Sequence, residues 1–231
     1  MKISIVIPCY NEINTIDKII KSLELVFSNY EYEIIIIDDY SNDGSREFLQ
    51  NNYSKSSKYT LIFNEKNFGK GYSLNSGFQK ASGEIICIQD ADLEYDPNDL
   101  IPMVKLIMKN KADVVYGSRF RGNGPVRANS FLNKFANFII SSLTNIFTNL
   151  SLTDIECCYK VFKKSDIQKI DLKEKRFGIE PELTIKFSML KLRIFETGIS
   201  YFGRTKQEGK KIGLKDGFRA IYCIFKYGIF K

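Results

Sequence analysis

Short, largely apolar runs alternate with longer segments of helical periodicity along the first half of the chain. The runs comprise residues 3–7, 34–37, 59–63, 85–88 and 112–116. Each is short and rich in β-branched or aromatic residues, as strands are, and the segments between them repeat apolar residues every three or four positions, as helices do. This alternation predicts an α/β, Rossmann-like fold with a mostly parallel sheet, right-handed crossovers and flanking helices.

One of these runs ends abruptly in acidic residues. Residues 85–88 lead directly into Asp90 and Asp92. In an open α/β sheet, ligands bind at the carboxyl ends of the strands. Two carboxylates one residue apart can converge on one hard divalent cation, which commonly bridges to substrate phosphates. The pattern indicates a metal and diphosphate site, although in isolation a solvated acidic turn before Asp96 and Pro97 would read the same.

Polar turns also follow the first two runs. Residues 8–12 bring a ring, an amide and a carboxylate to a strand end, where they could hold a nucleobase or simply begin a helix. The four isoleucines of residues 34–37 indicate a strand buried on both faces, and the acids of residues 38–45 follow it. A carboxylate there could accept hydrogen bonds from a nucleoside, or belong only to a polar turn. Because carboxylates crowded at one sheet edge repel each other, a cation and a nucleotide would explain their presence.

The turn before the third predicted helix contains Gly69, Lys70 and Gly71. Glycines and a lysine at a helix amino terminus can cradle a phosphate. Their spacing matches neither the Walker A loop nor G-x-G-x-x-G, which disfavours an NTPase or a dehydrogenase.

Composition narrows the chemistry. The 231 residues are 44% hydrophobic and 26% charged, which is typical of one globular domain. The chain has no histidine, so Ser-His-Asp and Cys-His mechanisms are excluded. The chemistry must rest on carboxylates and on Arg or Lys, with or without a metal. The net charge of +7 suits anionic partners such as sugar nucleotides, phosphorylated lipids or anionic membranes. We expect no nucleic acid partner because no RNA or DNA module is recognisable.

The cysteines and the apolar stretches bear on location. The five cysteines form no C-x-x-C pair and are expected to be reduced core residues. The amino terminus is too quickly interrupted to resemble a signal peptide, and no apolar stretch approaches the roughly 18 to 20 residues that span a bilayer. We expect a cytoplasmic protein, soluble or peripheral on the cytoplasmic membrane face.

Two later segments could contact a membrane. Residues 131–150 carry an apolar face, and residues 214–231 combine aromatic and basic residues in a pattern that suits an anionic interface. Helices that dock on the sheet would show much the same pattern, so both interpretations stay open. A polyprenyl tail could lie along either segment.

Four motifs in order carry a family resemblance, at residues 7–12, 38–45, 67–71 and 90–93. Together they resemble a family 2 glycosyltransferase of GT-A fold, most closely the dolichyl- or polyprenyl-phosphate mannose and glucose synthases. Further matches extend over residues 117–120, 154–160, Glu182 and 204–211. The resemblance implies one domain over residues 1–231. Its parts would be a nucleotide-sugar-binding part (1–120), an acceptor part with a mobile loop (121–213) and a basic amphipathic helix (214–231).

The resemblance implies a role for each matching acid. Pro8, Tyr10, Glu12 and Asp39 would line the nucleoside pocket, and Asp38 would support it. Asn67 and Lys70 would also belong to the donor site. Asp90 and Asp92 would hold Mg²⁺ or Mn²⁺ on the donor diphosphate. Glu94 stands where related synthases commonly carry a glutamine ligand, which leaves the metal preference open.

Basic residues would act on the phosphates. Arg119 would bind a phosphate of the donor or of a lipid-phosphate acceptor, and Arg204 and Lys210 would belong to the loop that closes over the diphosphate. With the cation, they would stabilise the negative charge of the leaving group. The resemblance also implies inversion at the anomeric carbon.

The acceptor stays open between polyprenyl or dolichyl phosphate and a sugar hydroxyl of a cell-surface glycan. The lipid-phosphate synthases typically show Arg-x-x-Gly-x-Ser-Lys, of which residues 204–211 keep the arginine and the lysine only. A phosphate acceptor needs no strong base, whereas a hydroxyl needs a carboxylate to accept its proton. Asp154 is the candidate for that base or for an acceptor contact, or it is only a turn aspartate.

Other function classes fit less well. A non-catalytic nucleotide-sugar-binding subunit is disfavoured because Asp90, Asp92, Arg119 and Arg204 are all present. A nucleotidyltransferase would carry a glycine-rich, basic loop directly after the first strand, and residues 8–12 are not such a loop. The sequence does not indicate an oligomeric state.

Overall fold

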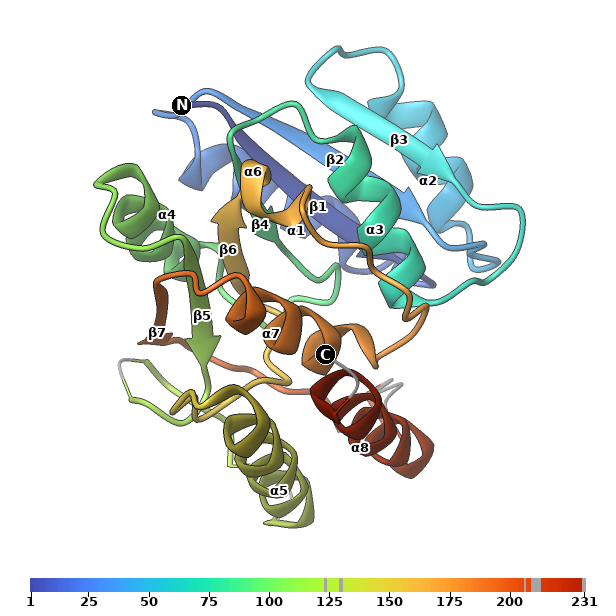
Figure 1. Cartoon of the computed structure of the whole chain (residues 1–231). Helices are drawn as coiled ribbons and strands as arrows, with labels where there is room; N and C mark the ends of the chain where they lie inside the picture. Colours follow the sequence, from blue (N-terminus) through green and yellow to red (C-terminus); the bar gives the residue numbers. More distant parts are fainter. Residues whose placement is uncertain (123, 129–130, 206, 209–212, 230–231) are drawn as a thin grey trace.

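The computed structural model describes residues 1–122, 124–128, 131–205, 207–208 and 213–229 of the chain (Figure 1). Its centre is a seven-stranded sheet of order β3-β2-β1-β4-β6-β5-β7. The strands are β1 (Ile3–Cys9), β2 (Tyr32–Asp38), β3 (Tyr59–Phe63), β4 (Ile85–Ile88), β5 (Val114–Ser118), β6 (Lys160–Lys163) and β7 (Ile194–Gly198). The predicted mostly parallel sheet is confirmed, because every pairing except those of β6 is parallel.

Helices connect the strands and flank the sheet. They are α1 (Ile16–Val26), α2 (Ser45–Tyr53), α3 (Lys70–Lys80), the 3₁₀ turn η1 (Pro97–Asp99), α4 (Leu100–Met108), α5 (Phe131–Thr148), α6 (Lys164–Ile167), α7 (Ile179–Met189) and α8 (Leu214–Ile229). Strand β3 has the predicted bounds. Strand β5 begins two residues later than predicted, after Asp113, whose carboxylate pairs with Lys163 and Arg193.

The order in which successive strands join the sheet reverses beside β1. Strands β2 and β3 lie on one side of β1, and the chain then returns to the other side to form β4. The crevice outside the strand ends at such a switch point is the common ligand site of open α/β sheets. The predicted acidic turns after β1 and β4 both begin there.

Strand β6, which the apolar pattern did not predict, brings a second set of residues to the same edge. It runs antiparallel between β4 and β5, with Val161 opposite Cys87 and Lys160 opposite Tyr116. Because its direction is reversed, the residues that precede it lie beside the carboxyl ends of β4 and β5. Residues 154–159 therefore approach the strand-end acids and Arg119.

Helices α5 and α8 pack together on the side of the molecule away from β3 (Figure 1), with the rings of Phe147 and Phe225 in edge contact. Helix α5 is polar on its inner face, where it buries Asn137, Ile140, Ser141 and Thr144. The two helices expose large apolar side chains at Phe131, Leu132, Phe135, Phe138, Ile139, Ile146, Phe218, Tyr222, Phe225 and Ile229. Much of the apolar face predicted for residues 131–150 is thus exposed, whereas Leu143, Phe147 and Leu150 pack against the core. None of the described helices has both the length and the apolar character needed to cross a bilayer.

Candidate active site

Three acids from two strand ends converge on one arginine. The guanidinium of Arg204 lies 3.0 Å from a carboxylate oxygen of Glu12, after β1, and 3.0 Å from one of Asp92, after β4. The backbone N–H of Arg204 donates to Glu94 Oε1 at 2.8 Å. The predicted convergence of the turns after β1 and β4 is therefore seen directly, and the segment after β7 lies across them.

Glu94 holds this segment in place. Its Oε2 accepts a hydrogen bond from the Tyr201 hydroxyl at 2.7 Å, and its backbone carbonyl accepts one from the N–H of Phe202 at 2.8 Å. Both carboxylate oxygens are thus engaged by the segment of residues 201–204. A metal-ligand role for Glu94 would require its carboxylate to exchange these partners, and it stays a prediction.

Asp90 pairs with a lysine. The ammonium of Lys70, the first residue of α3, lies 2.9 Å from Asp90 Oδ1 and 3.6 Å from Glu180 Oε1. Burial, together with the nearby charges of Asp90 and Glu94, raises the pKa of Asp92 to about 7. The crowded negative charge is therefore only partly balanced by Lys70 and Arg204.

The two carboxylates fit a hard divalent cation that draws its other ligands from a diphosphate and water. Among the described residues, no three acidic or cysteine side chains are grouped closely enough to hold an ion by themselves. The fit rests on Asp90 and Asp92, which lie one residue apart, and on the raised pKa of Asp92, because a cation would relieve that repulsion. Mg²⁺ and Mn²⁺ both accept such an oxygen set.

Asp38 and Asp39, at the end of β2, organise the neighbouring turn. Asp39 accepts hydrogen bonds from the Asn64 side chain (2.8 Å) and from the backbone N–H groups of Phe68 (2.9 Å) and Gly69 (2.7 Å). Its backbone carbonyl accepts a long one, 3.4 Å, from the side chain of Asn67. Asp38 is fully buried and pairs with Arg46 at 2.8 Å. Two of these hydrogen bonds use Asp39 Oδ1 and one uses Oδ2, so Oδ2 retains acceptor capacity for a nucleoside.

Pro8 and Tyr10 complete the predicted nucleoside side. Pro8 lies within β1, opposite Ile37 of β2. Tyr10, just after β1, is 36% exposed, so part of its side chain faces solvent at the switch point. Their roles in binding a nucleoside stay predictions.

The glycines of the 69–71 turn have a packing reason. A Cβ on Gly69 would come within 2.6 Å of the Lys175 carbonyl, and one on Gly71 within 2.4 Å of the Glu174 carbonyl. Gly69 also has a φ of +101°, a conformation that L side chains rarely adopt. The close approach of residues 174–176 therefore accounts for both glycines without a phosphate.

Arg119 and Asp154 form a bidentate ion pair. Arg119 Nε and Nη2 each donate to Asp154 at 2.7 Å, and the backbone N–H of Arg119 donates at 3.0 Å. Asp154 is fully buried, and the guanidinium lies 5.1 Å above the ring of Tyr201. A pocket of about 260 Å³ beside this pair is lined by Phe120, Lys134, Asn137, Phe138, Ser141, Ser142, Asn145, Leu152 and Thr153. Asp154 is thus committed to holding Arg119.

A second buried pair was missed by the sequence reasoning. Lys160, in β6, is fully buried and donates to Glu180 of α7 and to the Ile155 carbonyl at 3.0 Å. Glu180 also faces Lys70, so the pair connects α7 to the Asp90 side of the site. A lysine opening an apolar strand was the available signal, but its partner lies 20 residues away. The predicted Lys210 lies outside the described residues.

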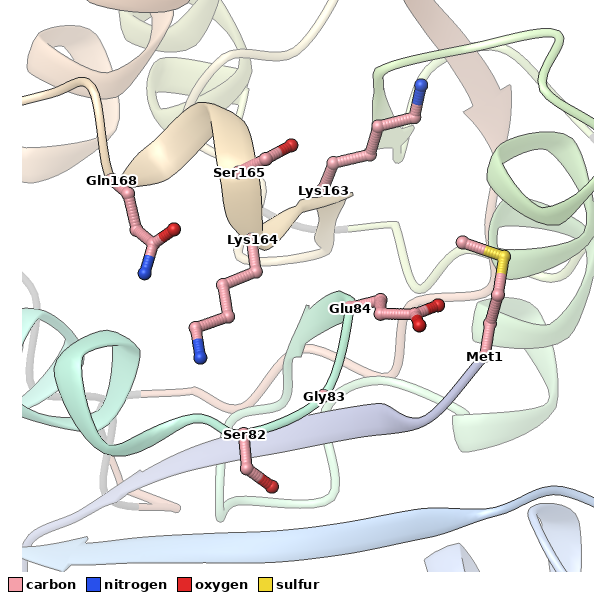
Figure 2. A pocket seen from close by; sticks show the side chains of 8 residues that line it. All are labelled: Met1, Ser82, Gly83, Glu84, Lys163, Lys164, Ser165 and Gln168. Atoms are coloured by element: carbon pink, nitrogen blue, oxygen red, sulfur yellow. The ribbon is translucent and has the colours of Figure 1, made fainter.

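A larger pocket, of about 470 Å³, lies at the opposite edge of the sheet, where β1 and β4 begin (Figure 2). It is lined by Met1, Ser82, Gly83, Glu84, Lys163, Lys164, Ser165 and Gln168. None of the predicted site residues lines it, and Lys163 is already paired with Asp113 at 2.6 Å. The candidate active site is therefore the cluster of acids and arginines at the carboxyl ends of β1, β4 and β5.

Solved structures share this fold. The crystal structure of glucosyl-3-phosphoglycerate synthase from Mycobacterium tuberculosis in complex with Mn²⁺ and uridine-diphosphate-glucose matches with a TM-score of 0.76 and 16% identity. The match covers 100% of this chain and 80% of that one. A structure of the same synthase with Mg²⁺ and uridine-diphosphate gives a TM-score of 0.74 at 17% identity, over the same shares of the two chains. These likenesses confirm the predicted GT-A-type fold.

Named relatives are similar in sequence. The dolichol-phosphate mannosyltransferase of Pyrococcus furiosus is 30% identical over an alignment 237 positions long, which covers 98% of this chain and 64% of that protein. The undecaprenyl-phosphate 4-deoxy-4-formamido-L-arabinose transferase of Pseudomonas savastanoi pv. phaseolicola is 27% identical over 192 residues, 80% of this chain and 54% of that protein. The chain thus spans between about half and two thirds of the length of these relatives.

The model of the family described as "Glycosyl transferase family 2" matches residues 4–171. This range contains the acidic turns after β1, β2 and β4 and the Arg119–Asp154 pair, and it covers most of the chain. The resemblance predicted from the four motifs is confirmed, and the chain belongs to glycosyl transferase family 2.

Proposed function

We propose that the chain is a metal-dependent, inverting glycosyltransferase that moves a hexose from a nucleotide sugar to a polyprenyl or dolichyl phosphate. The observation that carries this proposal is the convergence of Glu12, Asp92 and Glu94 on Arg204 at the switch point of the sheet. Family membership and the names of the two relatives, which refer to dolichol phosphate and undecaprenyl phosphate, support it.

The donor would bind at the strand ends. Tyr10 would stack on the base, and Asp90 and Asp92 would hold Mg²⁺ or Mn²⁺, which supplies positive charge to the diphosphate when bound. Arg204 lies 3.0 Å from Asp92 and is therefore within reach of a diphosphate bound there. Its guanidinium would stabilise the charge that develops on the leaving group as the bond to the anomeric carbon breaks.

The acceptor phosphate would bind at Arg119. A phosphate monoester is already anionic near neutral pH, so the reaction needs no strong base. Asp154 accepts three hydrogen bonds from Arg119, and we assign it the positioning of Arg119 in place of the base role considered from the sequence. A sugar hydroxyl of a glycan, the alternative acceptor, would need another carboxylate.

The exposed apolar face of α5 and α8 would contact the membrane that contains the lipid acceptor. Phe135 and Phe138 on α5 are more than half exposed, and so are Phe218 and Tyr222 on α8. Arg219 and Lys226, on α8, lie over the ring of Tyr222. Both also pair with Glu174, so the three residues together leave positive charge beside this face. An aromatic face flanked by cations suits the cytoplasmic surface of an anionic bilayer.

The test is transfer of radiolabelled sugar from GDP-mannose and from UDP-glucose to undecaprenyl phosphate, with Mn²⁺ or with EDTA. Label that enters the lipid phase only with Mn²⁺ is the expected result and identifies the donor. Metal-dependent nucleotide release without lipid label would favour the glycan acceptor. Absence of turnover of any donor, with a folded protein, would contradict the enzymatic proposal.

A further inference from the structure

Three ion pairs lie beside the candidate site, and a fourth carboxyl group near them, that of Glu156, belongs to none of the three. Lys70 pairs with Asp90 at 2.9 Å, Arg119 with Asp154 at 2.7 Å, and Lys160 with Glu180. Each of these three cations thus has a carboxylate of its own. Glu156 lies in the turn between Asp154 and β6, within the same cluster, and its Oε1 is buried without a hydrogen-bond partner among the described residues.

Glu156 is surrounded by charges of both signs. Burial, and then the charge of Glu180 from α7, raises the pKa of Glu156 to about 8, while Lys160 and Arg119 lower it and Asp154 raises it further. A carboxyl group with a buried oxygen that accepts no hydrogen bond favours its neutral form, because ionisation would place charge on an atom that neither water nor a donor stabilises. The group is therefore protonated near neutral pH, and it is partly exposed.

A protonated carboxyl group can donate a hydrogen bond to an anion, which a carboxylate cannot. Glu156 lies two residues after Asp154, which holds Arg119 through a 2.7 Å ion pair, so its carboxyl group is near the residue to which we assign the acceptor phosphate. An arriving dianionic phosphate would disfavour ionisation of Glu156 still more, so the proton would stay on the carboxyl group in the complex.

We propose that Glu156, in its neutral form, donates a hydrogen bond to the acceptor phosphate held at Arg119. This role rests on the proposed function and names a contact that distinguishes a phosphate from a hydroxyl acceptor. A hydroxyl acceptor would need Glu156 as an ionised base, whereas a phosphate acceptor needs it as a donor.

The two roles predict opposite responses to pH. Two neighbouring groups titrate above the relevant range. Burial raises the pKa of Cys157 to about 12. Burial lowers the pKa of Lys160, but Glu180, Tyr116 and Cys157 together outweigh it and raise that pKa to about 12. A phosphate monoester is mostly dianionic above about pH 7. Asp92 titrates near pH 7 in the wild-type protein and in Glu156 variants alike, so the difference between them from about pH 7 to pH 9.5 reports loss of the Glu156 proton.

The test is calorimetric titration of the full chain with farnesyl phosphate at the two ends of that range. For the wild-type protein we expect affinity to fall roughly tenfold as the protonated fraction declines. Glu156→Gln retains a donor that does not titrate, so its affinity should stay within about twofold of the neutral wild-type protein at both pH values. Glu156→Ala should bind roughly tenfold more weakly at neutral pH.

Glu84→Gln is the matched control, because Glu84 is exposed and lines the pocket at the opposite edge of the sheet. Its titration should follow that of the wild-type protein, and circular dichroism checks the fold of each variant. Wild-type affinity that does not change with pH, or Gln and Ala variants that weaken equally, would overturn the donor role alone. No binding of farnesyl phosphate to the wild-type protein would overturn the lipid-phosphate acceptor and this role with it.

Discussion

The contacts between single residues decide what each predicted site residue does. Arg119 and Asp154 were both singled out from the sequence, but as independent candidates. In the structure the fully buried Asp154 accepts three hydrogen bonds from Arg119. The two residues therefore act as a unit, in which the arginine meets the substrate and the aspartate sets its orientation.

Asp154→Ala should lower the free energy of unfolding by roughly 3 kcal/mol, because it leaves the Arg119 guanidinium without its carboxylate. Urea denaturation followed by circular dichroism measures this change. Replacing both residues, as Arg119→Met with Asp154→Leu, should recover much of the loss, since a buried ion pair is replaceable by apolar groups of similar size. A single variant as stable as the wild-type protein would show that the pair is not a structural unit.

Sequence reasoning at this scale found the acids but not their partners. Asp90, Asp92 and Glu12 follow buried strands, so their common edge was predictable from strand direction alone. Arg204 pairs with Glu12 and Asp92 although it is more than 100 residues away in sequence, because β7 and the segment after it bring it there. Glu94 was assigned to a metal by resemblance, whereas its hydrogen bonds to Tyr201 and Arg204 are tertiary and leave no local signal.

At the scale of elements, α5 is the most unusual helix of the fold. It buries Asn137, Ser141 and Thr144 and exposes Phe135 and Phe138. The periodicity predicted an apolar face, but the same pattern fits a helix docked on the sheet, so only the structure gives the direction of that face. Strand β6 escaped prediction because it has four residues, two of them lysines.

Phe135→Ser combined with Phe138→Ser should weaken binding to anionic lipid vesicles by roughly tenfold or more, because two exposed rings no longer enter the bilayer interface. Vesicle co-sedimentation measures the bound fraction. The control is Leu25→Ser on α1, since Leu25 is 77% exposed but lies outside this face. Equal binding by the double variant and the control would remove the membrane role of α5.

At the scale of the whole molecule, the two ends of the parallel strands differ: the candidate site lies at their carboxyl ends, and a network of hydrogen bonds lies at their amino ends. The edge where β1 and β2 begin is tied together by Glu33, which accepts hydrogen bonds from Lys2 and Ser4 of the β1 region and from Ser82 before β4. Burial alone would raise the pKa of Glu33, but these hydrogen bonds outweigh it and lower the pKa to about 2. Stability at this edge therefore depends on an ionised carboxylate.

The pH dependence follows from the sign of that shift. A lowered pKa in the folded state means that Glu33 contributes its full stabilisation above about pH 4.5 and loses it as pH falls towards about 2. Glu33→Gln should remove on the order of 2 kcal/mol of stability at neutral pH and should lose less on acidification. Denaturant titrations at several pH values measure both effects. Glu31→Gln is the control, because Glu31 is exposed. Parallel pH profiles for the wild-type and Glu33→Gln proteins would contradict the assignment.

The proposed function depends most on Asp90 and Asp92 as ligands of a metal ion that binds the donor diphosphate. Electron paramagnetic resonance of Mn²⁺, titrated with GDP or UDP present and absent, tests this claim directly in the wild-type protein, in Asp92→Asn and in Asp171→Asn. Asp171 is the control, because its side chain is 75% exposed and pairs only with Lys173 in the described part of the chain. We predict that the wild-type protein binds Mn²⁺ and that a nucleoside diphosphate strengthens this binding. Asp92→Asn should weaken Mn²⁺ binding by roughly tenfold or more. Mn²⁺ binding of equal strength in Asp92→Asn and in the wild-type protein would contradict it.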